Sequence, residues 1–330
     1  MESAFSLREI PKFSKKLRGS FWGITSFFNP AKYPNKVENY QKFRNSLKRQ
    51  GLKLVCVETV FDDSKFELKD SDAEILIQIR GNKKNIMWQK EAMLNIALKN
   101  LPKDCDKIAW LDADVIFQNY NWVKETAKLL EDYNVVQPFS YCVRLRKGDS
   151  IDSLDLNTLK FGIREGEFFF SSGFKYPKNN FDFENYFESG DFGFAWCARK
   201  EIFDNIGFYD KAILGGADYL IAKAFYGINW IPVKDIFSVR FGQDFLKYFN
   251  NLSRVIHKSV YFTRGNLFHL WHGDFVNRNY DKRYKILWEE NFSPTLDVSI
   301  GKNGLLEWSS DKFGLHDFVL DYFALRKECI

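Results

Sequence analysis

The stretch KIAWLDADVIF, from Lys107 to Phe117, decides the expected fold of this chain. Its apolar beginning indicates a buried strand, and Asp112 and Asp114 follow that strand directly, separated by one alanine. In an extended segment, positions i and i+2 project to the same side, so both carboxylates can converge on one point. Two unpaired carboxylates among bulky apolar neighbours are costly, and a hard divalent cation would relieve their repulsion and desolvation. The alternative interpretation is a turn capped by two aspartates.

Strand patterns and helical spacing alternate on both sides of this stretch. Strand patterns cover residues 21–28, 52–60, 73–79, 107–111 and 135–139, and helical spacing covers residues 37–48, 88–99 and 122–130. This alternation predicts an α/β fold with a mostly parallel, doubly wound sheet, right-handed crossovers and flanking helices. Ligands of such sheets bind beyond the carboxyl ends of the strands, which is where Asp112 and Asp114 stand.

The composition is that of an ordinary globular protein rather than a disordered or fibrous one. The 330 residues are 45% hydrophobic and 28% charged, with a net charge of +5. Because no basic tract interleaved with aromatic residues is present, we expect no nucleic-acid partner. Five widely spaced cysteines without a C-x-x-C pair argue against a zinc ribbon and a disulfide framework. Without a signal-peptide core or a spanning apolar run, we expect a soluble, cytoplasmic protein.

The chain divides into three expected regions. Residues 1–20 form a basic tail, which we expect to be solvated and to make at most peripheral contact with a membrane. Residues 21–285 form the main domain, and residues 286–330 form a C-terminal extension packed on that core. Within the main domain, residues 144–190 lose clear periodicity, which is typical of a loop-rich insert that shapes a binding site.

Three later motifs carry candidate functional residues. They are GFAWCAR at residues 193–199, GGAD at residues 215–218, and HLWHGD at residues 269–274. Paired glycines allow the backbone to approach a ligand closely, and Asp218 after them can accept a proton from a hydroxyl group. The alternative for Asp218 is a helix cap. If the third motif is extended, His269 and His272 face opposite sides, so both would not easily bind one ion.

Taken together, these motifs resemble the GT-A-fold glycosyltransferases, nucleotide-sugar-dependent enzymes whose D-x-D motif binds Mn²⁺ or Mg²⁺ beside the donor diphosphate. The resemblance runs from about residue 21 to residue 285. It implies a GT-A fold and a metal site formed by Asp112, Asp114 and His272, with His269 as the fallback ligand. Two carboxylates, one imidazole and diphosphate oxygens make a ligand set that suits Mn²⁺.

The GGAD motif resembles the Gly-Gly-Glu-Asp-Asp of inverting β-1,4-galactosyltransferases, in which the first aspartate is the general base. The resemblance therefore implies that Asp218 is the base of an inverting transfer. Ala217 and Tyr219 depart from that pattern, so the acceptor contacts made by those side chains are not carried over.

The donor is expected to be a UDP-sugar, and the acceptor a hydroxyl group of a glycan, glycolipid or protein. Besides Asp112 and Asp114, candidate donor-binding residues are Ser26, Arg80 and Trp196, with Lys90 and Asp191 ranked lower. Three alternatives stay open at this point: a retaining glycosyltransferase on the same fold, a non-catalytic sugar-binding protein, and a metal-dependent phosphohydrolase.

Overall fold

The computed structural model describes residues 8–153, 168–178, 181–183, 190–229, 237–278 and 283–328. Much of the predicted loop-rich insert at residues 144–190 therefore lies outside the described residues. The centre of the protein is a seven-stranded sheet in the order β10-β6-β9-β4-β1-β2-β3. The strands are, in chain order, β1 (Ser20–Phe28), β2 (Lys53–Phe61), β3 (Ile75–Gly81), β4 (Cys105–Leu111), β6 (Val135–Gln137), β9 (Ala195–Arg199) and β10 (Val260–Phe262). The predicted strand at residues 107–111 is therefore the middle of this sheet.

The sheet is mostly parallel, as predicted. Strands β3, β2, β1 and β4 are parallel neighbours, and β10 is parallel to β6. Only β9 runs the other way, paired antiparallel with both β4 and β6. Because the four consecutive parallel strands share one direction, their carboxyl ends meet at one edge, where the residues after β4 emerge.

Two smaller sheets accompany the central one. The first has the order β5-β11-β7-β8, built from β5 (Val115–Phe117), β7 (Tyr141–Arg144), β8 (Phe168–Phe170) and β11 (Asn266–His269). The second pairs β12 (Val298–Ile300) with β13 (Leu306–Trp308). Antiparallel pairing of β11 with β5 sets His269 opposite Val115, and so brings the late histidine motif back to the D-x-D turn.

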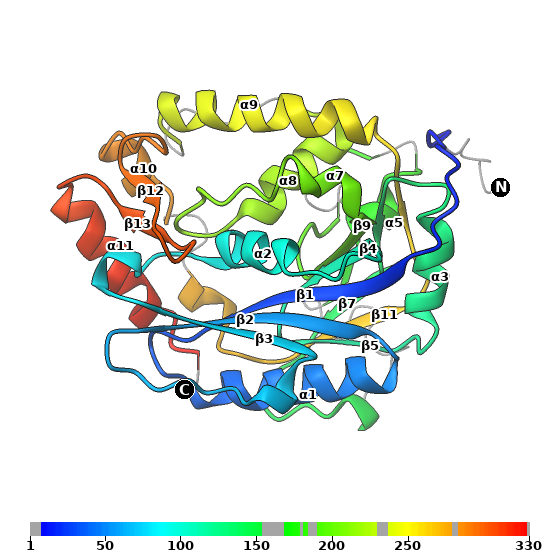
Figure 1. Ribbon diagram of the computed structural model, residues 1–330, viewed down its shortest axis with the longest axis horizontal. Helices are drawn as coiled ribbons and strands as arrows, with labels where there is room; N and C mark the ends of the chain where they lie inside the picture. Colours follow the sequence, from blue (N-terminus) through cyan, green and yellow to red (C-terminus); the bar gives the residue numbers. More distant parts are fainter. Residues whose placement is uncertain are drawn as a thin grey trace.

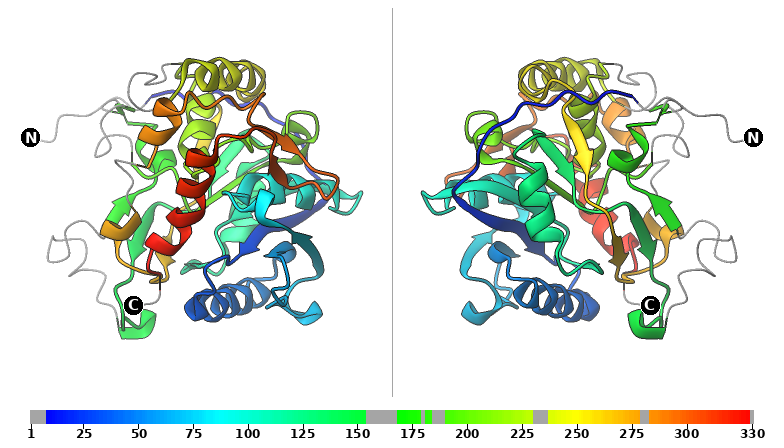
Figure 2. Two further views of the ribbon diagram at one scale, coloured as in Figure 1. Left: turned by 90° about the vertical axis from the view of Figure 1, so that its left-hand side faces the viewer. Right: turned by 90° about the vertical axis from the view of Figure 1, so that its right-hand side faces the viewer.

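Helices cover both faces of the central sheet. They are α1 (Pro34–Arg49), α2 (Lys90–Lys99), α3 (Trp122–Leu129), α5 (Ser172–Lys175), α7 (Lys200–Asp204), α8 (Ala217–Tyr226), α9 (Val239–Ile256), α10 (Lys285–Glu289) and α11 (Phe313–Leu325), with 3-10 turns at Asp70–Asp72, Lys83–Asn85, Ile151–Ser153 and Phe275–Arg278. Figure 1 shows α1 below the sheet and α2, α8 and α9 above it. Figure 2 shows the same layers from the side, with α9 outermost. The chain is thus a mixed α/β protein with flanking helices, which confirms the predicted fold class.

Local sequence explains one of the predicted helices, α1, and also a long helix, α9, that was not predicted. In α1 a proline occupies the first turn, where its missing N–H costs nothing, and Tyr40, Phe43 and Leu47 are buried at helical spacing. Helix α9 begins at Ser238, whose hydroxyl accepts from the Phe241 N–H, and its buried residues also follow helical spacing. The signals for α9 are thus present in the sequence, although its residues are not among the predicted helices.

The described part of the N-terminal region differs from the predicted solvated tail. The Phe13 N–H donates to the Asp132 carbonyl at 2.8 Å, and the Lys15 N–H donates to the Glu131 carbonyl at 2.7 Å. The buried guanidinium of Arg199 donates to the Phe13 carbonyl. Residues 8–19 therefore lie against the rest of the protein. Hydrogen bonds to protein groups, rather than to water, satisfy these backbone atoms. No helix in the described ranges combines the length and the apolar character that crossing a membrane requires.

Helix α11 from the C-terminal extension lies near the carboxyl end of β1. The Tyr33 hydroxyl donates to the carbonyls of Phe323 and Ala324, both at 3.0 Å. The ring of Phe323 also lies 5.9 Å from that of Phe28, the last residue of β1. The extension therefore packs at the edge of the sheet where the candidate site lies.

Candidate active site

Hydrogen bonds from three elements fix the turn that carries the two aspartates. The Thr25 hydroxyl on β1 donates to the Leu111 carbonyl at 2.7 Å. The Asp112 N–H donates to the Phe194 carbonyl at 2.8 Å, and the Leu270 N–H donates to the Asp114 carbonyl at 2.8 Å. Because the turn is tied to β1, to the start of β9 and to the end of β11, its two side chains have defined positions.

Asp112 belongs to a cluster with Lys90 and Asp218, here called the lysine cluster. The Lys90 ammonium lies 2.6 Å from an oxygen of Asp112. It lies 3.0 and 3.1 Å from the two oxygens of Asp218. Lys90 is the buried first residue of α2, whereas the two aspartates are partly exposed. One buried cation therefore joins the D-x-D motif to the predicted base, although 106 positions separate the two aspartates in sequence (218 − 112).

Burial and charge oppose each other in this cluster. Burial lowers the pKa of Lys90. The charges of Asp112 and Asp218 raise it by more than burial lowers it, so the pKa lies well above its ordinary value. Burial raises the pKa of Asp218, and Lys90 offsets only part of that effect. A carboxylate whose pKa is raised is a better proton acceptor than an ordinary aspartate, provided that it stays ionised. Lys90 is the group that keeps it ionised.

Replacing Lys90 by methionine should destabilise the protein by about 2–3 kcal/mol at neutral pH, because two adjacent carboxylates lose their shared cation. Without Lys90 the pKa of Asp218 should rise further above its unfolded value. A carboxyl group of this kind favours folding at low pH and loses that contribution as the pH rises. The deficit of Lys90→Met should therefore be small near pH 4 and grow toward pH 7. Urea unfolding at both pH values measures it, and a deficit that shrinks as the pH rises would contradict this account.

Asp114 belongs to a second group with His269 and His272, here called the histidine cluster. Nε2 of His272 lies 3.2 Å from one oxygen of Asp114, and Nε2 of His269 lies 3.6 Å from the other. The two Nε2 atoms are 3.1 Å apart. One ligand atom from each residue lies within 4.8 Å of the others, which is the spacing of a possible metal site.

This arrangement corrects the expectation that the two histidines face opposite sides. Strand β11 ends at His269, so the alternation of an extended chain stops there. The Leu270 N–H is then bonded to the Asp114 carbonyl, and Gly273 has φ of +96°, a left-handed conformation that suits glycine. The chain therefore turns, and His272 returns to the side of His269. The structure gathers Asp114, His269 and His272, while Asp112 is held by Lys90.

The histidine cluster fits a divalent cation. Burial lowers the pKa of His272 to about 3 and that of His269 well below its ordinary value, so both rings are neutral and have a nitrogen lone pair to donate. Burial and the neighbouring Asp112 raise the pKa of Asp114 to about 7. One buried oxygen of Asp114 also has no hydrogen-bond partner in the part of the chain that the structure describes. Two imidazoles and a carboxylate are a ligand set suited to Mn²⁺ and related ions.

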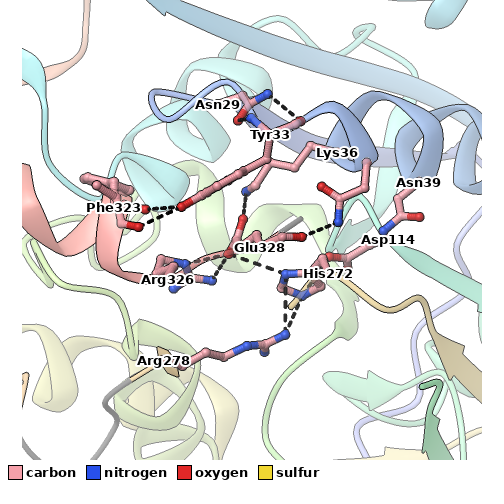
Figure 3. A network of polar contacts seen from close by, with 12 residues as sticks. Asn29, Tyr33, Lys36, Asn39, Asp114, His272, Arg278, Phe323, Arg326 and Glu328 are labelled. Carbon is pink, nitrogen blue, oxygen red and sulfur yellow. Dashed lines mark hydrogen bonds and ion pairs between the residues drawn. The ribbon is translucent and has the colours of Figure 1, made fainter. Parts of the chain in front are cut away.

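Charged residues surround His272 of the histidine cluster, as Figure 3 shows. Arg278 lies 2.8 Å from Nε2 of His272, and Glu328 lies 3.4 Å from Nδ1 of the same ring. Glu328 in turn contacts Lys36 at 3.1 Å and Arg326. None of these four residues was singled out from the sequence, because they come from three separate segments and belong to no motif. Only the fold places them together.

The other predicted donor-binding residues have different surroundings. Ser26 is half-buried on β1, beside Val57 of β2, and follows Thr25, whose hydroxyl is bonded to the Leu111 carbonyl. Arg80 lies on the edge strand β3, three strands from β4, and donates to the carbonyls of Asp62 and Ser64. Its charge is therefore engaged away from the two clusters.

Trp196 and Asp191 are both buried. Trp196 is 1% exposed, its indole N–H donates to the Phe192 carbonyl at 2.8 Å, and its ring packs on Phe225. It is a core residue, which argues against the predicted contact with a donor. Asp191 is 6% exposed, bonded to Arg144 at 3.1 Å and to the Gly193 N–H at 2.8 Å. These contacts hold Asp191 in the fold rather than present it to an acceptor.

The paired glycines before Asp218 have a packing role that sequence reasoning did not foresee. Gly215 and Gly216 have φ of +81° and +86°. A Cβ on Gly216 would lie 2.0 Å from the Tyr284 hydroxyl oxygen, and one on Gly215 would lie 3.2 Å from the Trp88 ring. The space beside these glycines is thus filled by the protein itself. Asp218 is the second residue of α8, and the N-cap of that helix is Gly216. The alternative interpretation, in which Asp218 is the helix cap, is therefore wrong.

The fold and the two clusters define an α/β protein with a carboxylate–lysine and a carboxylate–histidine centre at the carboxyl edge of its sheet.

No family model and no curated protein matches the chain. Among solved structures, it is similar to glucosyl-3-phosphoglycerate synthase from Mycobacterium tuberculosis, in complex with Mn²⁺, UDP and phosphoglyceric acid, at 11% identity and a TM-score of 0.39, over 82% of this chain and 76% of that one. It is also similar to the catalytic domain of Drosophila β1,4-galactosyltransferase 7, at 14% identity and a TM-score of 0.31, over 74% of this chain and 64% of that one.

A third similar structure is Staphylococcus aureus TarS, at 14% identity and a TM-score of 0.35, over 61% of this chain. The chain spans 32% of the length of that structure, and less than two thirds of the Drosophila domain. We therefore base the functional conclusion on the site itself.

Proposed function

We propose that this protein is a metal-dependent glycosyltransferase that moves a sugar from a nucleotide-sugar, a UDP-sugar, to a hydroxyl acceptor with inversion. The observation that carries the proposal is the contact of Lys90 with both Asp112 and Asp218. It brings the D-x-D turn and the predicted base to one place, which a transfer reaction needs because donor and acceptor must meet. The sequence resemblance to GT-A glycosyltransferases rests on the same residues.

The residues of the histidine cluster would hold the metal, with Asp112 close by in the same turn. An ion bound there would supply Lewis-acid stabilisation of the diphosphate that leaves the sugar. Asp218 accepts the proton of the attacking hydroxyl group, and its raised pKa suits that task. Lys90 keeps Asp218 ionised before the transfer and offsets its repulsion with Asp112.

The half-buried setting of the two aspartates in the lysine cluster supports a catalytic rather than a purely structural role. Asp218 and Asp112 expose 25% and 27% of their side chains, while Lys90 beneath them exposes 9%. Each carboxylate is therefore held from the protein side and open on the other. A base must reach its substrate, and the exposed side of Asp218 leaves that access open.

A donor screen tests this proposal. The protein is incubated with UDP- and GDP-sugars, with Mn²⁺ or with EDTA, and release of the nucleotide is measured. We expect UDP-sugar turnover that depends on Mn²⁺ and a product anomer, read by NMR, opposite to that of the donor. Unchanged turnover in EDTA would contradict the metal, and retention of the anomer would contradict the role of Asp218. Nucleotide binding without turnover would favour a sugar-binding protein.

A further inference from the structure

We propose that Glu328 is a positioning residue, which holds the ring of His272 so that its Nε2 lone pair is available to a metal ion. The inference rests on the proposed metal centre and deepens it. The segment after α11, from Arg326 to Glu328, thereby has a role in the site. This segment is far along the chain from the D-x-D turn. The tautomer of His272 that it predicts exists in the protein without any metal.

The neighbours of His272 determine which nitrogen carries the hydrogen. Arg278 has only donors, and its terminal nitrogen lies 2.8 Å from Nε2 of His272 and 3.4 Å from Nδ1. Two distances this similar place the guanidinium nitrogen over the face of the ring near Nε2, where it disfavours a positively charged ring but does not itself fix the tautomer. On the other side of the ring, Oε1 of Glu328 lies 3.4 Å from Nδ1, and a carboxylate only accepts. Asp114, 3.2 Å from Nε2, is also an acceptor, so the two carboxylates compete for the one ring hydrogen, and the proposed form is the one in which Glu328 holds that hydrogen on Nδ1.

Glu328 is held firmly in this position. Its side chain is 1% exposed, and its carboxylate contacts Lys36 at 3.1 Å and also Arg326. Its backbone carbonyl accepts from the Asn35 amide. A buried carboxylate with two cationic partners does not turn freely, because leaving them would leave its charge buried and unpaired. In Figure 3 these contacts bring α1 and the segment after α11 together around His272.

The backbone shows a close fit between this segment and the histidine motif. Lys327 has φ of +45°, an uncommon conformation for a residue that is not glycine, and this bend precedes Glu328. On the opposite side, a Cβ on Gly273 would lie 2.8 Å from Cα of Glu328 and 2.9 Å from the Lys327 carbonyl. The glycine next to His272 therefore gives the segment room to lie against it.

The arrangement matches a general property of histidine ligands. A metal-binding histidine donates its other ring N–H to a carboxylate or carbonyl, which fixes the tautomer and makes the ligating nitrogen more basic. Loss of such a partner weakens metal binding by about 10- to 100-fold. Binding also requires Arg278 to withdraw from Nε2, since its guanidinium nitrogen lies 2.8 Å from that atom and its charge would repel a cation.

The tautomer can be measured directly, because the chain has only four histidines. In ¹⁵N-histidine-labelled protein without metal, we expect nitrogen shifts of the Nδ1–H form for His272. Glu328→Ala should move this ring toward the Nε2–H form, whereas Glu328→Gln, whose amide oxygen still accepts, should retain most of the original form. Asp321→Ala removes an exposed carboxylate from α11 and is the matched control.

Calorimetric titration with Mn²⁺ gives the second readout. Glu328→Ala should weaken Mn²⁺ binding by about 10- to 100-fold, with Glu328→Gln in between and Asp321→Ala unchanged. If Glu328→Ala does not fold, Glu328→Asp keeps the charge beside Lys36 and Arg326 but withdraws it from Nδ1, and should show the same shift in tautomer. A folded variant with wild-type tautomer and Mn²⁺ affinity would overturn the inference. Failure of the wild type to bind Mn²⁺ would instead overturn the proposed metal centre, and the tautomer would still decide the role of Glu328.

Discussion

Asparagine in place of Asp114 should weaken Mn²⁺ binding by more than about 100-fold and abolish metal-dependent turnover. Asp114 is the one carboxylate in the histidine cluster, and it lies 3.2 Å from His272 and 3.6 Å from His269. Losing it removes the negative charge that offsets a divalent ion, a larger change than the loss of a residue that only supports a ligand. Calorimetry with Mn²⁺ measures the effect, and Asp321→Asn on α11 is the control.

The same variant, Asp114→Asn, tests the electrostatics of the cluster without metal. The pKa of Asp114 is raised to about 7 in the folded protein, well above its ordinary value. Such a group favours folding at low pH, and its contribution is lost as the pH rises through about 7. The substituted asparagine carries no charge at any pH, so the variant should gain stability relative to the wild type between pH 5 and 8, on the order of 2 kcal/mol. A constant difference across this range, measured by unfolding in EDTA, would contradict the raised pKa.

The second large effect concerns Asp218→Asn, which should lower the rate of sugar transfer by about 10²- to 10⁴-fold, the usual contribution of a general base. Asparagine keeps the size of the side chain but cannot accept the proton of the attacking hydroxyl group. The affinities for UDP-sugar and Mn²⁺ should change little, because the histidine cluster does not include Asp218. The measurement is the transfer rate beside the binding constants of the same protein.

A matched control separates catalysis from the loss of an ion pair. Asp204 pairs with Lys200 at 2.6 Å on α7, and Asp204→Asn removes a lysine–aspartate contact away from the site. It should leave transfer unchanged. Near-normal transfer by Asp218→Asn would exclude Asp218 as the base and favour a retaining reaction, since Asp191 is already engaged by Arg144.

The sequence alone predicted the fold class, and it predicted where the candidate site lies. Apolar runs with regular spacing predicted β1, α1, β2, β4 and α3 to within a few residues, because these elements bury one side or both sides against neighbours and their pattern is local. The position of Asp112 and Asp114 directly after a buried strand placed them at the carboxyl edge. Asp218 followed from its motif, and it does lie beside Asp112 through Lys90.

The tertiary structure decided which side chains meet. Lys90 was ranked low because nothing in its surroundings in sequence fixes the direction of its side chain, and only the packing of α2 on the sheet aims it at Asp112 and Asp218. His269 and His272 come together because strand β11 ends and the chain turns, which an extended-strand argument could not include. Glu328 and Lys36 reach His272 only because α1 and the segment after α11 pack at the same edge. Periodicity reports what one element buries, whereas a site is made by contacts between elements distant in sequence, and those depend on the packing of the whole fold.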